Sequence, residues 1–224
     1  MVNRIAVFKV RDSASADQLA ELERDIRSIP QNVPSVKRVS LGPELITNGV
    51  WTYVWDVEFD GVEGIDAYLN DPWHIEHLSG RFSPAKPASL VEKIDFIYYT
   101  RAYFDVKAPD AKDPFRRLLM SNIPDTVAQA KIDEFEETIR RLPAEVPTVG
   151  NSALGKATAH KTPTPWTHVR ESEFVDEEAM QAYQEHPFHT GVLRPFFHPD
   201  FPESRLVDKV INVCYRPPSS FIAD

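Results

Sequence analysis

The chain of 224 residues is long enough for two domains of ordinary size, each with its own core. Its formal net charge of −9 and its pI near 5.3 argue against nucleic acids and anionic membranes as partners. We find no apolar run of membrane-spanning length, and the start of the chain reads as a strand, not as a signal peptide. A single cysteine, Cys214, excludes an internal disulfide, so we expect a cytoplasmic protein.

The first half of the chain alternates strand and helix patterns. In chain order these predict a strand at 4–10, a helix at 13–29 ended by Pro30, strands at 36–41 and 51–59, a helix at 64–69, a short helical stretch at 74–78 and a strand at 92–99. Residues 104–114 are rich in Ala, Asp, Lys and Pro and are expected to form a linker. We therefore predict one domain at 1–103 and a second at 115–217.

The second half repeats the first. Residues 4–30 align with 117–143 at one constant offset, and the Trp-Thr pair at 51–52 recurs at 166–167 after a short insertion. The second half accordingly predicts strands at 117–123, 149–154, 166–174 and 208–215, and helices at 126–142 and 177–184. A unit of roughly 100 residues was duplicated and fused. The order strand-helix-strand-strand-helix-strand predicts the α+β class, with an antiparallel sheet covered by helices on one face, as in ferredoxin-like units.

The third strand differs between the two copies. Successive strand residues point to opposite faces, so Tyr53 and Trp55 share one face, and the matching face of the second copy carries His168, Arg170 and Ser172. Three further polar residues are expected on this face: Arg117, Ser121 and Asn212. Burying such groups without partners would cost about 1–3 kcal/mol each. Either they satisfy one another in a network, or they line a wet cavity that binds a ligand.

The two copies are therefore expected to differ in their interiors. The aromatic side chains of the first copy should fill much of its own pocket, and the second copy should hold the larger and more polar cavity.

Both copies contain the pattern Tyr-x-x-x-Pro-x-His, formed by Tyr68, Pro72 and His74 and again by Tyr183, Pro187 and His189. With the Phe-Lys-Val first strand and the Trp-Thr start of the third, this pattern resembles the stress-responsive A/B barrel (Dabb) domain family, over nearly the whole chain and twice. The resemblance implies two ferredoxin-like (dimeric α+β barrel) repeats that form an intramolecular pseudo-dimeric barrel. A homodimer of this fused pseudo-dimer is compatible with the sequence, which does not decide it.

The resemblance also implies a site. In olivetolic acid cyclase members of the family, the Tyr and the His of this pattern carry an aldol cyclisation, and a second His lies in the third strand. By that resemblance His189, Tyr183 and His168 are the catalytic candidates, with His189 as the general base. The candidates for substrate binding are Arg117, Arg170, Trp166, Phe188, Ser121 and Asn212. A second site in the first copy would comprise His74, Tyr68, Tyr53 and Arg4.

These residues indicate a cofactor-independent lyase or cyclase that cleaves a C–C bond or performs an aldol-type cyclisation on a phenolic or polyketide-like small molecule. Two alternatives remain open: a cofactor-free monooxygenase acting on an electron-rich aromatic, and a non-catalytic stress-response protein that binds a ligand. We expect no cofactor, because the acid-base mechanism that the resemblance implies needs none. We also expect no metal, because no carboxylate or cysteine completes a ligand set with His186 and His189.

Overall fold

The computed structural model describes residues 1–222. The chain divides into two compact units. The first comprises residues 1–100 and 160–164, and the second comprises the remainder of the described chain.

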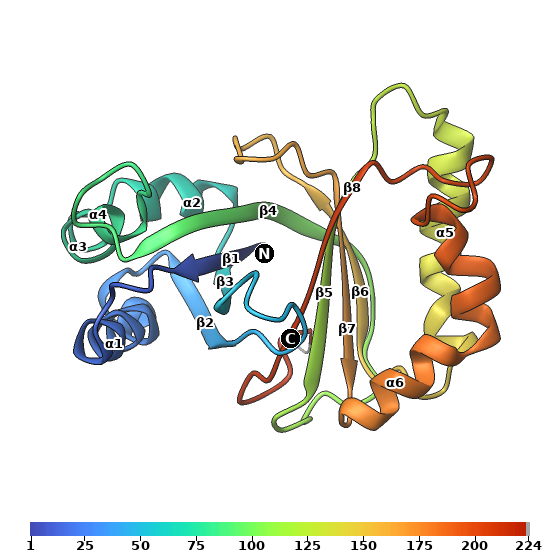
Figure 1. Ribbon diagram of the computed structural model, residues 1–224, viewed down its shortest axis with the longest axis horizontal. Helices are drawn as coiled ribbons and strands as arrows, with labels where there is room; N and C mark the ends of the chain where they lie inside the picture. Colours follow the sequence, from blue (N-terminus) through green and yellow to red (C-terminus); the bar gives the residue numbers. More distant parts are fainter. Residues whose placement is uncertain (223–224) are drawn as a thin grey trace. The chain divides into compact units, whose positions relative to one another are not determined.

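The first unit is a four-stranded antiparallel sheet with helices on one face (Figure 1). Its strands are β1 (Val2–Val10), β2 (Val36–Pro43), β3 (Tyr53–Phe59) and the part of β4 (Val91–Asp105) up to residue 100, in the order β2-β3-β1-β4. Its helices are α1 (Ala16–Asn32), α2 (Val62–Leu69), α3 (Pro72–His74), the π-helix η1 (Ile75–Ser79) and α4 (Gly80–Phe82). The core lies between α1, α2 and the face of the sheet that carries Phe8, Trp55 and Phe59.

The second unit repeats this plan. Its strands are β5 (Phe115–Asn122), β6 (Ser152–Ala157), β7 (His168–Phe174) and β8 (Lys209–Tyr215), in the order β6-β7-β5-β8. Its helices are α5 (Gln129–Glu145), α6 (Glu177–Glu185), the π-helix η2 (Phe188–Leu193) and the 3₁₀ helix η3 (Arg194–Phe196). Helices α5 and α6 cover one face of this sheet (Figure 1). The α+β class with two ferredoxin-like repeats is thus confirmed.

Helix α1 begins at a capping box, in which Ser15 and Gln18 satisfy each other's backbone N–H groups. It does not end at Pro30, as the sequence predicts, but continues to Asn32. Helix α5 likewise runs past Pro143. A proline in the last turn removes one N–H donor but does not prevent the residues after it from completing that turn. In α1 the N–H of Val33 donates to the carbonyl of Ile29.

Two further elements differ from expectation. Strand β4 continues to Asp105, so that the first residues of the predicted linker are strand. In both units the Tyr-x-x-x-Pro-x-His segment leads into a π-helix. The sequence predicts a short helical stretch at 74–78 in the first unit and no corresponding helix in the second. Single π turns occur frequently at functional sites.

The sheet face of the second unit opposite Arg170 buries a network of charges. Arg116 lies 2.7 Å from Glu171 and 3.0 Å from Glu173, and Arg101 lies 2.8 Å from Glu171. The backbone of Phe221 joins the same network, because its N–H donates to Glu173 and its carbonyl accepts from Arg101. Every carboxylate here has cationic partners, which is the condition under which buried ions are tolerated.

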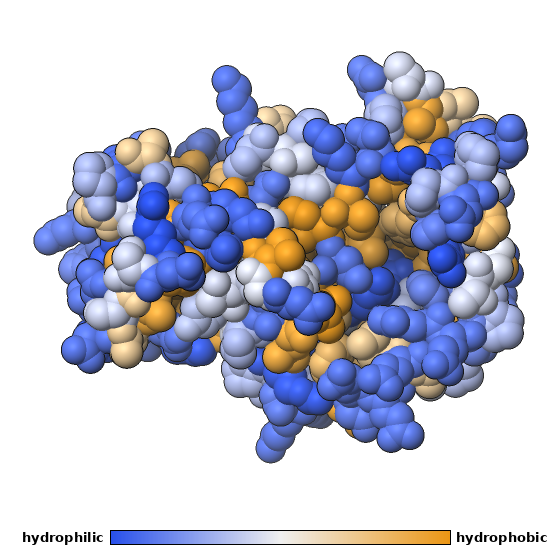
Figure 2. Space-filling model, in the orientation of Figure 1, coloured by the Kyte–Doolittle hydropathy of each residue, from blue (hydrophilic) through white to orange (hydrophobic). Residues whose placement is uncertain are grey.

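Figure 2 shows hydrophilic side chains over most of the visible surface, with smaller apolar patches between them. Of the helices in residues 1–222, none has both the length and the apolar character that a membrane crossing needs.

Candidate functional site

The Tyr-x-x-x-Pro-x-His element brings Tyr183 and His189 together. Tyr183 lies in the last turn of α6 and is fully buried, and His189 follows in the first turn of η2. Their ring centroids are 4.5 Å apart. The Nδ1 of His189 lies 2.8 Å from the carbonyl oxygen of Gln184. Because a carbonyl only accepts, Nδ1 carries the proton, and Nε2 keeps the lone pair that a base requires.

Two arginines from the sheet lie over the same tyrosine. The guanidinium carbons of Arg117 and Arg170 are 5.5 Å and 5.2 Å from the centroid of the Tyr183 ring. Arg117 donates to the Tyr183 hydroxyl at 3.2 Å and to the Asn212 side-chain oxygen at 2.9 Å. The pairing explains this convergence: Leu119 faces Arg170 on β7 and Asn212 on β8, and Arg117 lies two residues away on the same face.

These side chains line a cavity of about 180 Å³. Its wall is formed by Arg117, Leu119, Arg170, His189, Leu193, Arg194, Phe197, Val210 and Asn212. One part of the wall is cationic and the other is apolar. Pockets for drug-sized ligands measure roughly 300–1,000 Å³, so this cavity suits a small molecule or one ring of a larger one.

The cavity keeps its histidine neutral. Burial lowers the pKa of His189 to about 4; the hydrogen bond to the Gln184 carbonyl raises it, and the charges of Arg170 and Arg117 lower it. Burial also lowers the pKa of Arg170, with the neighbouring Arg117 acting in the same direction. At neutral pH the imidazole is therefore an uncharged acceptor beside two cations.

The structure places His168 outside this cavity. Its Nε2 lies 3.3 Å from a carboxylate oxygen of Glu136 on α5, and its Nδ1 lies 2.9 Å from the Thr167 hydroxyl. Phe135 makes ring contacts with His168 and with Phe197, which is part of the cavity wall. The chain spacing to Tyr183 suggested a shared site, but the imidazole turns to α5. A catalytic role of His168 stays a prediction that no contact in the cavity supports.

Of the six residues expected to bind substrate, Arg117, Arg170 and Asn212 line the cavity, whereas Trp166, Phe188 and Ser121 do not. The ring of Phe188 lies under the guanidinium of Arg141. The carbonyl of Ser121 accepts from the backbone N–H of Thr167, next to the paired ends of β5 and β7. Leu193, Arg194 and Phe197 also line the cavity but are not among the predicted site residues, because the segment that carries them has no helical pattern in the sequence.

The first unit contains the matching pair in a different setting. The rings of Tyr68 and His74 are 4.1 Å apart, and burial, aided by Arg4, lowers the pKa of His74 to about 4. The guanidinium of Arg4 lies 4.5 Å from the Trp55 ring and 4.9 Å from the Phe96 ring. Trp55 and Phe96 thus occupy the positions that Arg170 and Asn212 have in the second unit.

This first cavity also measures about 180 Å³. The expectation of a more polar cavity in the second copy is confirmed. The expectation of a larger one is wrong: polar side chains replace aromatic ones in its wall, and the two volumes are the same. Tyr53 does not line the first cavity. Its hydroxyl bonds to Glu23 on α1, as His168 pairs with Glu136 on α5.

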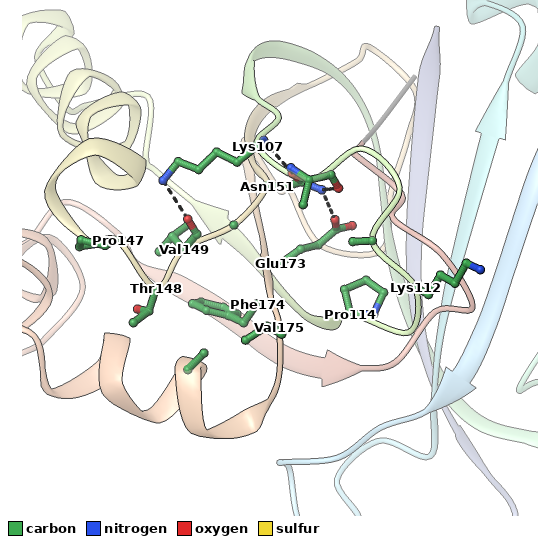
Figure 3. A pocket seen from close by; sticks show the side chains of 14 residues that line it. Lys107, Lys112, Pro114, Pro147, Thr148, Val149, Asn151, Glu173, Phe174 and Val175 are labelled. Atoms are coloured by element: carbon green, nitrogen blue, oxygen red, sulfur yellow. Dashed lines mark hydrogen bonds between the residues drawn. The ribbon is translucent and has the colours of Figure 1, made fainter.

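A larger cavity of about 590 Å³ lies elsewhere in the second unit, against residues 107–114 (Figure 3). Three of its polar side chains are bonded to protein groups: Asn151 donates to Glu173 at 2.9 Å, and Lys107 donates to the Val149 carbonyl at 3.0 Å. None of the catalytic and substrate-binding candidates named above lines it. Size alone therefore does not make it the better candidate.

The described part of the chain contains no group of three or more His, Cys, Asp or Glu side chains arranged to hold a metal ion. His186 instead accepts a hydrogen bond from the backbone of Phe188.

The family model for the stress responsive A/B barrel domain matches residues 2–97 and 115–211, so the chain belongs to this family and carries its domain twice. No curated protein matches the chain. Among solved structures, an anthrone oxidase-like protein superposes with a TM-score of 0.69 at 9% identity, covering 96% of this chain and 90% of its own.

Two putative monooxygenases also superpose over nearly the whole chain. The one from Fusobacterium nucleatum has a TM-score of 0.64 at 7% identity, covering 100% of this chain and 95% of its own. The one from Lactobacillus acidophilus has a TM-score of 0.56 at 12% identity, covering 97% and 94%. Identities this low establish a shared fold alone.

Proposed function

We propose that the second repeat is the active site of a cofactor-independent oxygenase, in which His189 removes a proton from a small electron-rich aromatic substrate and the resulting anion reacts with O₂. The observation that carries the proposal is the state of His189. Its Nδ1 proton is held by the Gln184 carbonyl, and it lies in the wall of a cavity shared with two arginines.

In the ligand-free protein His189, with a pKa of about 4, is a weak base, but a bound anionic substrate would raise this pKa. Burial is the main cause of the lowered pKa of His189, and an anionic group between Arg117 and Arg170 offsets the arginine charges that add to it. The bound complex then contains a stronger base than the empty protein, at the place where the proton must leave. Arg117 is fixed by Tyr183 and Asn212 and so is oriented in advance to stabilise a developing oxyanion.

The reaction balances without a further reductant. His189 takes a proton from an activated ring methylene, and the carbanion adds to O₂ with formation of a C–O bond. The imidazolium returns the proton to the peroxide. Loss of water then breaks the O–O bond and leaves a carbonyl, so that one oxygen atom enters the product and the other enters water. The names of the anthrone oxidase-like protein and the two putative monooxygenases support oxidation over other fates of the anion.

A lyase or cyclase is the second candidate, and the Tyr183–His189 pair within the Tyr-x-x-x-Pro-x-His element favours it. Its first step is the same proton abstraction. The two functions differ only in whether the anion meets O₂ or a carbonyl carbon of the substrate.

The test is to screen phenolic and polyketide-like compounds with an oxygen electrode and product analysis, with and without air. Oxygenase activity requires one O₂ consumed per product and no turnover under argon. Turnover that persists under argon would identify the lyase or cyclase, and saturable binding without turnover would identify a ligand-binding protein. The His189→Ala variant must lose the activity in either catalytic case.

A further inference from the structure

We infer that Arg170 is a carboxylate anchor, so that the natural ligand of the second repeat is a small aromatic carboxylate and not a neutral phenol. The inference rests on the proposed function only in that it names the substrate class of the same site. Arg170 is 3% exposed, and its Nη2 atom has no hydrogen-bond partner. The cavity that Arg170 lines is the place where a partner for Nη2 can bind.

The counter-charge for this cavity is absent from the described chain. Neither Arg170 nor Arg117 forms an ion pair with any carboxylate of residues 1–222. The contrast with Arg116 is instructive, because it differs from Arg117 by one position, points to the other face and has two carboxylate partners. In a chain of net charge −9, two buried arginines without an acid mark a site whose anion comes from outside.

The shape of the wall defines the rest of the ligand. The wall also contains Leu119, beside Arg170 on the sheet, and Leu193 and Phe197, whose side chains offer no hydrogen bonds and suit an apolar ring. A guanidinium presents parallel N–H donors that match the two oxygens of a carboxylate. The geometry thus calls for a planar anion attached directly to a small aromatic body.

The first repeat provides an internal comparison. There Trp55 takes the position of Arg170, and the remaining cation, Arg4, is covered by aromatic rings. The two cavities have the same volume, so the difference between them is charge and not size. The carboxylate preference should therefore belong to the second repeat.

The experiment compares salicylate with its neutral analogue salicylamide by isothermal titration, using wild type, Arg170→Met, Arg170→Trp and Arg141→Met. Arg141 is exposed and does not line the cavity, so its variant removes one positive charge of the second unit outside the site. The Arg170→Trp variant introduces the residue that the first repeat has at this position, which guards against a failure of Arg170→Met to fold.

Wild type should prefer salicylate, and both Arg170 variants should lose roughly 10- to 100-fold in salicylate affinity, the value of a charge-assisted hydrogen bond. Salicylamide affinity should stay unchanged in Arg170→Met, and Arg141→Met should change salicylate affinity by less than about threefold. Salicylate should also raise the pKa of the His189 imidazole followed by NMR, and Arg170→Met should abolish that rise.

Equal affinity of wild type for the two compounds would overturn the inference, as would undetectable salicylate binding at millimolar concentration or full salicylate affinity in the Arg170 variants. These readouts involve no turnover. A carboxylate preference without O₂ uptake would therefore refute the oxygenase and leave the anchor standing, whereas O₂ uptake without the preference would refute the anchor alone.

Discussion

The imidazole of His189 packs against the phenol ring of Tyr183 at 4.5 Å between ring centroids, and the Tyr183 hydroxyl in turn accepts a hydrogen bond from Arg117. The tyrosine thus connects the proposed base to the proposed oxyanion donor. The corresponding rings of the first repeat, Tyr68 and His74, are in contact too, at 4.1 Å, so the contact alone does not distinguish the two units. The two units differ instead in the charged side chains that surround this pair of rings.

Replacing Tyr183 by Phe keeps the ring contact and removes the acceptor that orients Arg117. We expect turnover to fall by roughly 10²–10³-fold, as for loss of one preorganised donor, with the unfolding midpoint nearly unchanged. Steady-state kinetics and urea unfolding measure the two effects. The matched control is Tyr68→Phe, which should leave turnover near wild type. Equal losses in both variants would show that the two cavities share the activity.

The pH dependence of catalysis should reflect the cations around His189. Burial, with the arginine charges, lowers the pKa of His189 to about 4, and the base must be neutral to act. The acid limb of kcat/KM, which reports the free protein, should therefore lie near pH 4, below the ordinary histidine value of about 6.5. The acid limb of kcat should lie at higher pH, because the bound anion offsets the arginines. Coincident limbs near 6.5 would contradict this electrostatic account.

The same shift predicts how stability depends on pH. Because the pKa of His189 is lowered on folding, the unfolded chain binds the proton first as the pH falls. The contribution of His189 to stability is thus present above about pH 6.5 and is lost between 6.5 and 4. The free energy of unfolding should fall less steeply over this window in His189→Ala than in wild type, measured by urea titration at several pH values. An unchanged slope would show that the folded imidazole titrates normally.

The buried network on the opposite face should matter for stability and not for ligand binding. Burial alone would raise the pKa of Glu171, but Arg101 and Arg116 outweigh it and hold the value at about 2. Arg116→Ala leaves buried carboxylates without their partner and should cost roughly 3–5 kcal/mol. The exposed pair Arg141–Glu145 serves as the control, where Arg141→Ala should cost about 0.5 kcal/mol or less. Urea unfolding at pH 7 separates these outcomes.

Most helices and strands could be predicted from the sequence, because the duplication gives the pattern of each element twice. The strands, the first helix and the Tyr-x-x-x-Pro-x-His element recur at matching positions, and two independent readings reinforce each other. Pro30 misled because a proline near a helix end resembles a stop signal, although the last turn can accommodate it.

The site was only half predictable. Strand alternation correctly grouped Arg117, Arg170 and Asn212 on one face, since their register follows from the sheet. Alternation could not show that His168 prefers Glu136, because that partner lies on a helix and the choice depends on a side-chain rotamer. Alternation also could not reveal that Glu171 is buried. It shows which residues share the second face of a strand, but not whether that face contacts solvent or protein.

This account makes a definite prediction for His168. Because its imidazole pairs with Glu136, His168→Tyr should recreate the Tyr53–Glu23 contact of the first repeat and keep the fold. Turnover should change by less than about tenfold, whereas loss of a general acid or base would cost roughly 10²–10⁴-fold. A loss in that higher range, with an unchanged circular dichroism spectrum, would return His168 to the catalytic group.

The central claim is that the second repeat alone performs base-initiated chemistry through His189. Its most direct test is the turnover of His189→Ala beside His74→Ala, in the same assay and with folding verified by circular dichroism. The account predicts a loss of roughly 10²–10⁴-fold for His189→Ala, the contribution of a positioned base, and near-wild-type turnover for His74→Ala. Near-wild-type turnover in folded His189→Ala, or equal losses in the two variants, would contradict it.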